Sequence, residues 1–133
     1  MKIGIVYFSK GGRTKTIAEA MAEELGIHAH AISDSEAKEE YNLLFIGAAP
    51  YANYIDPVMK DYIVGVKPEQ VKKAVLFSTS NWSMRAIRRM TELLSANGVE
   101  IAEETYHANA FHIPASIESA KKFAHDIKEK YEQ

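Results

Sequence analysis

The chain has 133 residues, of which 47% are hydrophobic and 26% charged, values typical of a globular protein with room for one hydrophobic core. Sixteen basic and eighteen acidic residues give a formal charge of −2, which argues against a nucleic-acid-binding protein and against a strongly acidic one. There is no cysteine, which excludes disulfides, thiolate nucleophiles and cysteine metal sites.

The sequence carries no targeting or membrane signal. No stretch approaches the roughly 18 apolar residues that a membrane-spanning helix needs. Met1-Lys2 leads directly into an apolar run, without the pattern of a signal peptide. We therefore expect residues 1–133 to form a single cytoplasmic domain, with no membrane insertion and no nucleic-acid partner.

The first apolar run, Lys2 to Phe8, predicts a buried strand, and a glycine-rich loop connects it to an amphipathic run. Such a loop directs backbone N–H groups and the positive end of the helix dipole toward one point, which suits a phosphate. Its glycines allow an anion to approach closely, its hydroxyls can donate hydrogen bonds, and its basic side chains add positive charge. An ordinary strand-to-helix turn with a threonine N-cap is the alternative. The candidate phosphate ligands are Ser9, Lys10, Gly11, Gly12, Arg13 and Thr14.

Apolar and amphipathic runs alternate through the rest of the chain. We expect strands at Ile27–Ile32 (an edge strand), Leu43–Gly47, Lys73–Thr79 and within Glu100–Phe111. We expect helices at Thr14–Leu25, closed by Gly26, from Asp56-Pro57 to Val64, at Met84–Asn97, and at Ile117–Lys130, capped by Ser116; Asp34–Tyr41 is a turn or a helical stub. The alternation predicts an α/β fold, a doubly wound five-stranded parallel sheet with helices on both faces.

The glycine-rich loop matches neither GxxxxGK[ST] nor GxGxxG. It resembles the phosphate loop of the flavodoxins, [ST]-x-[ST]-G-x-T after the first strand, in which the phosphate belongs to FMN. Ser9, Gly12 and Thr14 fall on this pattern, whereas Gly11 replaces the middle hydroxyl residue. The resemblance covers essentially the whole chain and implies the flavodoxin-like strand order 2-1-3-4-5.

That strand order would bring two further loops to the same crevice, because ligands of such sheets sit where the strand order reverses. The segments 47–53 and 77–83 resemble the flavodoxin loops that flank the flavin ring, the second being similar to the FGSYGWG type. Tyr51 and Trp82 would stack on the two ring faces, although each could instead be a packing residue. The implied ribityl and ring site comprises Ala49, Pro50, Tyr51, Ala52, Asn53, Ser78, Thr79, Ser80, Asn81 and Trp82.

Some features depart from the flavodoxin pattern. Many short-chain flavodoxins have a glycine where Ala52-Asn53 stands here, and alanine resists the left-handed conformation. Electron-carrying flavodoxins tend to be strongly acidic, whereas this chain is nearly neutral and has three arginines after the second ring loop: Arg85, Arg88 and Arg89. These arginines fit either a solvated helix face with salt bridges or an anionic partner or substrate.

The histidines leave a question open. His28 and His30 lie two residues apart on the predicted edge strand, where a solvent-facing pair is commoner than a metal site. His107 and His112 lie near the end of the fifth strand, and the sequence does not settle whether either reaches the flavin.

The resemblance implies a monomeric electron-transfer protein that binds FMN noncovalently. It would carry one or two electrons between redox partner proteins, a reductase donor and an acceptor enzyme, with no catalytic acid or base and no metal. Two alternatives remain. One is an FMN-dependent NAD(P)H:quinone-type reductase, and the other is a flavin-free flavodoxin-fold module that acts through its surface.

Overall fold

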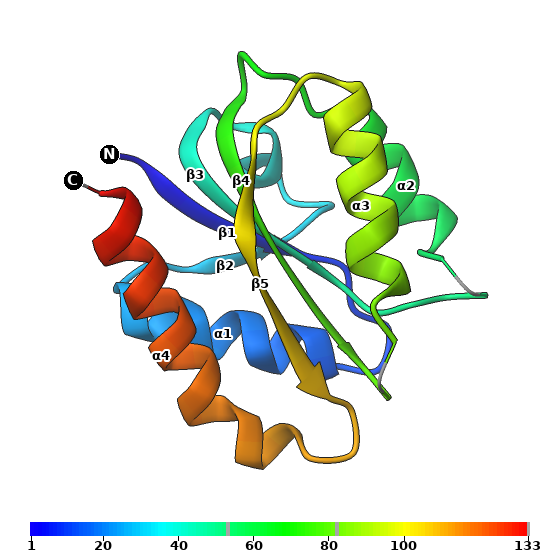
Figure 1. The fold of residues 1–133 in the computed structure, drawn as a ribbon, viewed down its shortest axis with the longest axis vertical. Helices are drawn as coiled ribbons and strands as arrows, with labels where there is room; N and C mark the ends of the chain where they lie inside the picture. The colour runs from blue at the N-terminus through cyan, green and yellow to red at the C-terminus, as the bar shows by residue number, and fades with distance from the viewer. Residues whose placement is uncertain (53, 82, 133) are drawn as a thin grey trace.

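In the computed structural model, which describes residues 1–52, 54–81 and 83–132, five parallel strands form one sheet in the order β2-β1-β3-β4-β5 (Figure 1). The predicted fold class and strand order are therefore confirmed. The strands are β1 (Ile3–Tyr7), β2 (Ala29–Ala31), β3 (Tyr41–Ala48), β4 (Val71–Ser80) and β5 (Ile101–Asn109).

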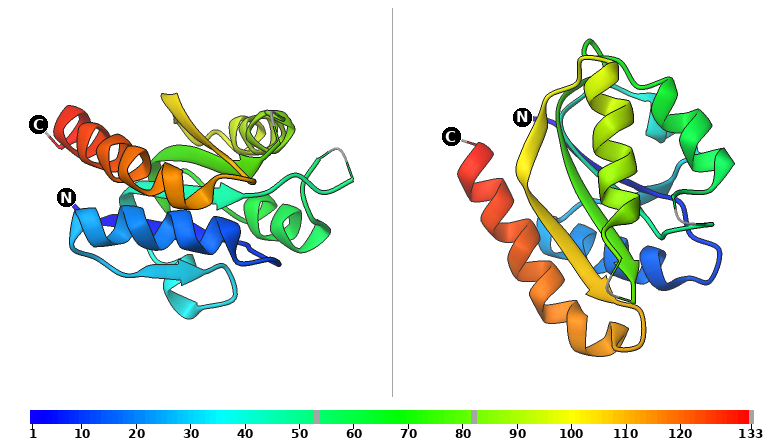
Figure 2. Two further views of the ribbon diagram at one scale, coloured as in Figure 1. Left: turned by 90° about the horizontal axis from the view of Figure 1, so that it is seen from below. Right: turned by 45° about the vertical axis from the view of Figure 1, so that its right-hand side comes forward.

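Helices cover both faces of the sheet, as Figure 2 shows. α1 and α4 pack together on one face, and α2 and α3 pack together on the other. The helices are α1 (Arg13–Leu25), the short 3₁₀ helix η1 (Ser35–Lys38), α2 (Pro57–Val64), α3 (Arg85–Ala96) and α4 (Ile113–Tyr131).

Each face of the sheet has its own hydrophobic core. Phe45 and Phe77 of the sheet are fully buried under α1 and α4, and on the other face Met59 of α2 and Met90 of α3 are fully buried. Successive residues of a strand point to opposite faces, so β3 and β4 supply both cores and read as continuous apolar runs. The two cores hold these strands in place, and the loops that follow them form most of the site described below.

Most helix boundaries follow the predicted signals. Gly26 closes α1 in the left-handed conformation, with φ 69°. Asp56 caps α2 by accepting a hydrogen bond from the Val58 N–H at 2.8 Å.

The predicted start of the last helix is wrong. α4 begins at Ile113, and Ser116 lies inside its first turn, where its hydroxyl donates to the His112 carbonyl at 3.1 Å. Pro114 explains the earlier start, because a proline in the first turn has a φ suited to the helix and its missing N–H would have had no partner there.

The end of α4 is joined to the sheet by Glu104 of β5. Its carboxylate accepts hydrogen bonds from the Lys130 ammonium and, at 2.6 Å, from the Tyr131 hydroxyl. These two hydrogen bonds, the one from Lys130 being the stronger influence, lower the pKa of Glu104 from 4.5 to about 2.

Among the described residues, no helix is both long and apolar enough to cross a membrane.

A lowered carboxyl pKa in the folded state means that Glu104 stabilises the fold fully above pH 4.5 and loses this contribution as the pH falls toward 2. We expect Glu104→Gln to lower the free energy of unfolding at pH 7 by about 1 kcal/mol, because the pair is partly exposed and screened. At pH 3 the loss should shrink to roughly half of that value. Urea unfolding of both proteins at the two pH values measures this, and an equal loss at both would contradict it.

Candidate functional site

The loop between β1 and α1 has the form of an anion-binding turn. Gly12 precedes the first residue of α1 and has φ 87°, a conformation that favours glycine. Its N–H donates to the Ser9 hydroxyl oxygen at 3.0 Å, so the loop closes on itself. The N–H groups of the first helical turn have no acceptors inside the helix and point out of its positive end.

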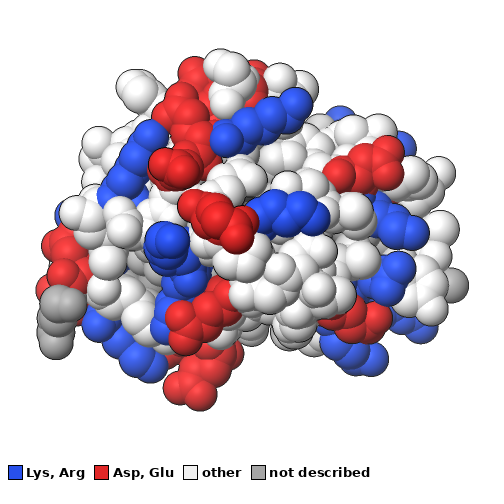
Figure 3. Space-filling model, turned by 90° about the horizontal axis from the view of Figure 1, so that it is seen from above, with Lys and Arg blue, Asp and Glu red and all other residues white. Residues whose placement is uncertain are grey.

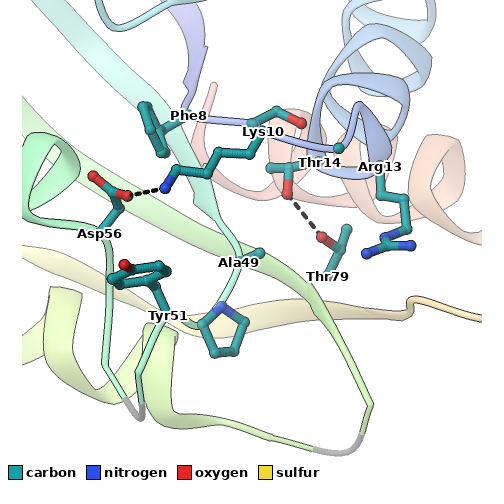
Figure 4. A pocket seen from close by; sticks show the side chains of 11 residues that line it. Phe8, Lys10, Arg13, Thr14, Ala49, Tyr51, Asp56 and Thr79 are labelled. Carbon is teal, nitrogen blue, oxygen red and sulfur yellow. Dashed lines mark hydrogen bonds and ion pairs between the residues drawn. The ribbon is translucent and has the colours of Figure 1, made fainter.

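Thr14 connects this turn to the end of β4. Its hydroxyl lies 2.7 Å from the hydroxyl of Thr79, and both side chains are buried (Figure 4). A hydroxyl has one proton and can accept two hydrogen bonds. When Thr79 donates to Thr14, the Thr14 proton is therefore available for a ligand in the loop. Thr79 is in this way a positioning residue for Thr14.

We expect Thr79→Val and Thr14→Val each to lower the free energy of unfolding by about 1–3 kcal/mol, because each leaves the partner hydroxyl buried and unpaired. The double variant should cost less than the sum of the singles, by about 0.5–3 kcal/mol, because it leaves no orphaned hydroxyl. Urea unfolding of the four ligand-free proteins completes the cycle. Additive single effects would show that the two hydroxyls do not depend on each other.

Lys10 is paired with a residue of another loop, although its side chain remains 62% exposed. Its ammonium lies 2.8 Å from a carboxylate oxygen of Asp56 and 4.5 Å from the centre of the Tyr51 ring (Figure 4). The hydrogen bond from Lys10 lowers the pKa of the Asp56 carboxyl, and the hydrogen bond from the Val58 N–H lowers it further. The same Lys10–Asp56 bond raises the pKa of Lys10. The pair is therefore charged at neutral pH, and it joins the loop after β1 to the start of α2.

The loop after β3 contains a tight turn between Tyr51 and Tyr54. The two residues exchange backbone hydrogen bonds, 3.0 Å from the Tyr51 N–H and 2.8 Å from the Tyr54 N–H. Ala52 has φ 45°, the left-handed conformation that the sequence led us to consider costly for alanine. The two backbone hydrogen bonds between Tyr51 and Tyr54 offset the cost of this conformation, about 1–2 kcal/mol.

Two adjoining hollows lie at the carboxyl ends of β1, β3 and β4. The first, of about 180 Å³, lies between the loop after β1 and the loop after β3; the second, of about 280 Å³, extends toward the loops after β4 and β5. Eleven predicted site residues line one or both: Ser9, Lys10, Gly11, Arg13, Thr14, Ala49, Pro50, Tyr51, Thr79, Ser80 and Asn81. Both hollows lie beside the junction of β1 and β3, where the strand order reverses.

Other predicted site residues lie elsewhere. Gly12 and Ala52 shape their turns without lining either hollow. Ser78 is fully buried, and its hydroxyl has no hydrogen-bond partner among the described residues. It projects to the same face of β4 as Leu76, toward the core under α2 and α3. Asn53 and Trp82 lie outside the described residues, so the predicted pairing of Tyr51 with Trp82 stays a prediction.

Four lining residues were not predicted as part of the site: Phe8, Asp56, Ser83 and Ala110. Asp56 was identified only as a helix cap, and its pairing with Lys10 depends on side-chain geometry across 46 positions that no local pattern encodes. Ala110 could have been anticipated, because β5 is parallel to the other strands and its following loop lies at the same edge.

The histidines take different positions. His107 Nε2 lies 2.7 Å from the Ser80 hydroxyl, so it contacts the second hollow through a residue that lines it. His30 lies 3.5 Å from Asp34, on the edge strand. Among the described residues, no three His, Cys, Asp or Glu side chains are placed to hold a metal ion.

The flavodoxin domain model matches residues 4–112, most of the chain. The chain belongs to the flavodoxin domain family. The predicted resemblance of the chain to the flavodoxin family is thereby confirmed. Among curated proteins, none matches the sequence.

Solved flavodoxins share the fold of this flavodoxin domain. An archaeal flavodoxin superposes with a TM-score of 0.84 at 22% identity, covering 100% of both chains. Oxidised flavodoxin 2 of Bacillus cereus superposes with a TM-score of 0.79 at 20% identity, covering 98% of this chain and 100% of its own. A Fusobacterium nucleatum flavodoxin bound to flavin mononucleotide has a TM-score of 0.74 at 12% identity, covering 98% and 99%. At these identities the likeness shows the fold alone.

Proposed function

We propose that this flavodoxin domain binds FMN noncovalently and carries one or two electrons between redox partner proteins, a reductase donor and an acceptor enzyme. In this proposal residues 1–133 act as one monomeric domain in the cytoplasm. The observation that carries the proposal is the meeting of a phosphate-type loop with two adjoining hollows at the point of strand reversal. The Fusobacterium nucleatum neighbour, which binds FMN, supports the choice of cofactor.

The donor set of the loop fits a phosphate. The Gly12 N–H now donates to the Ser9 hydroxyl oxygen. A phosphate oxygen would take the place of that oxygen as the acceptor. Thr14 can donate its proton, as its pairing with Thr79 allows. Arg13 lines both hollows, and no carboxylate within the described part of the chain pairs with it. Its guanidinium can therefore bind a phosphate without first losing another partner.

The ribityl chain and ring would occupy the second hollow and the exposed side of Tyr51. Ser80 and Asn81 offer polar groups to a ring edge. The Lys10 ammonium lies over the Tyr51 ring, so the flavin would stack on the other face of the ring or displace the ammonium. The cofactor supplies the redox chemistry when bound, and the residues described here hold it, orient it and exclude water.

Flavin binding tests the proposal directly. We expect the purified protein to quench the fluorescence of added FMN and to retain it through gel filtration. Riboflavin, which lacks the phosphate, should bind more weakly. A protein that stays colourless and leaves FMN fluorescence unchanged would instead be the flavin-free interaction module.

A second function, an FMN-dependent NAD(P)H:quinone-type reductase, is favoured by the positive side chains that begin α3, because nicotinamide nucleotides are anionic. Rapid oxidation of NADPH by the FMN-loaded protein and a quinone, without a separate reductase, would establish it. Electron transfer only after an added reductase would exclude it.

A further inference from the structure

Exposed apolar side chains border the cleft on several loops. Seven large hydrophobic residues among the described ones are well exposed, and four of them follow β3, β4 or β5 at the carboxyl edge. These are Tyr51, Tyr54, Met84 and Phe111, the last 69% exposed. Figures 1 and 2 place the loops after these strands along one edge of the sheet. Exposed apolar residues around a cleft are typical of a surface that contacts another molecule.

The same edge is positively charged. Arg85, Arg88 and Arg89 lie in the first turns of α3, directly after the loop that ends β4. Arg89 pairs with Glu92 at 3.1 Å, and its guanidinium lies 5.8 Å from the centre of the Tyr54 ring. Arg89 thus joins the start of α3 to the turn after β3.

Asp34 and Glu36 follow β2 at this edge, whereas the helix starts that border the cleft lack acidic side chains. None of α1, α2, α3 and α4 has an acidic residue in its first turn, although helix starts normally favour them. Asp56 is 7% exposed and already holds Lys10. The face where β4 and β5 begin, by contrast, shows Lys, Arg, Asp and Glu side chains interleaved (Figure 3). The positive edge therefore belongs to one side of a chain whose overall charge is −2.

FMN would not neutralise the whole edge. Its phosphate would lie in the loop that contains Arg13, whereas Arg85 and Arg88 start a different helix on the other side of the cleft. Both are exposed. Positive charge beside the ring end of the cleft would thus remain after the cofactor binds.

We propose that this edge, defined by Tyr54, Met84, Phe111 and the arginines of α3, docks a redox partner protein with an acidic surface around its own redox centre. The proposal rests on the proposed function and specifies its partner. A small anion would need basic groups that converge on one pocket, whereas these arginines and apolar residues are spread over three loops and a helix. Arginine and aromatic side chains at a protein-sized surface are typical of protein interfaces.

The test uses two electron acceptors of opposite charge, plant plastocyanin (an acidic blue-copper protein) and mitochondrial cytochrome c (a basic haem protein). Each FMN reduced with two electrons reduces two acceptor molecules, one electron going to each Cu(II) or Fe(III), and the flavin's protons pass to solvent. Stopped-flow rates are measured from about 10 to 200 mM salt, the range over which screening becomes strong. We expect the plastocyanin rate to fall roughly tenfold across it and the cytochrome c rate to rise or stay constant.

Paired charge reversals locate the effect. Arg85→Glu/Arg88→Glu should lower the low-salt plastocyanin rate about tenfold, because it reverses the charge at the docking edge. Lys38→Glu/Lys72→Glu makes the same change in net charge at exposed residues away from that edge, on η1 and at the start of β4, and should change the rate by about twofold at most. FMN retention is measured first for every variant, so a failure of cofactor binding is recognised before any kinetics.

Two outcomes would overturn the docking proposal while leaving FMN binding intact. One is a plastocyanin rate that rises with salt, or a low-salt plastocyanin rate that falls by the same factor in both double variants. The other is direct reduction of the flavin by NADPH that Arg85→Glu/Arg88→Glu abolishes, with no salt effect on plastocyanin, because the arginines would then bind a nucleotide phosphate. If the native protein retains no FMN, the proposed function itself fails.

Discussion

Arg13→Gln is expected to weaken FMN binding by about 10- to 100-fold, since a charge-assisted hydrogen bond contributes about 1.5–3 kcal/mol. Arg13 is the basic side chain that lines both hollows, and among the described residues it has no carboxylate partner. Lys10, by contrast, already pairs with Asp56, so less of its charge is available to a phosphate. Fluorescence titration of the ligand-free protein with FMN gives the dissociation constant.

Riboflavin is the control for this prediction, because it has the same ring and no phosphate. Its affinity should change by about twofold at most in Arg13→Gln if the guanidinium acts on the phosphate. Lys72→Gln removes one positive charge from an exposed position at the start of β4 and should leave both affinities unchanged. Equal weakening of FMN and riboflavin by Arg13→Gln would show that the substitution disturbs the cleft as a whole.

The sequence identified the parts of the site that depend on local order. The loop from Ser9 to Thr14 could be read because a strand, two glycines, hydroxyls and a helix follow one another, and the helix start fixes where its N–H groups point. The strand order came with the family resemblance, since alternation alone does not distinguish the possible orders.

What could not be predicted depends on contacts between distant residues. The Lys10–Asp56 pair and the Arg89–Tyr54 contact each join separate loops through long side chains whose rotamers no pattern specifies.

Ser78 was assigned to the ring site from the loop resemblance, whereas strand alternation already places its side chain in the core. The wrong start of α4 came from choosing a serine cap over the proline signal at Pro114.

The largest effect on stability is expected where β3 and β4 support the site. Gly47 pairs with Phe77 in the sheet, immediately before the loop that contains Pro50 and Tyr51. A Cβ at position 47 would lie 2.1 Å from the fully buried Phe77 ring. Phe77→Ala should lower the free energy of unfolding by about 3–5 kcal/mol through the cavity it leaves, and Gly47→Ala by about 1–3 kcal/mol through overpacking. Urea unfolding at pH 7 measures both.

Combining the two substitutions separates this explanation from a general sensitivity of the core. In Gly47→Ala/Phe77→Ala the new methyl group enters the space left by the ring, so the double variant should be more stable than the sum of the single losses predicts, by about 0.5–3 kcal/mol. Gly65→Ala is the matched control, because a Cβ there comes no closer than 3.4 Å to another atom. If the losses at positions 47 and 77 simply add, the Phe77 ring is not what excludes a larger side chain at position 47, and the glycine there needs a different explanation.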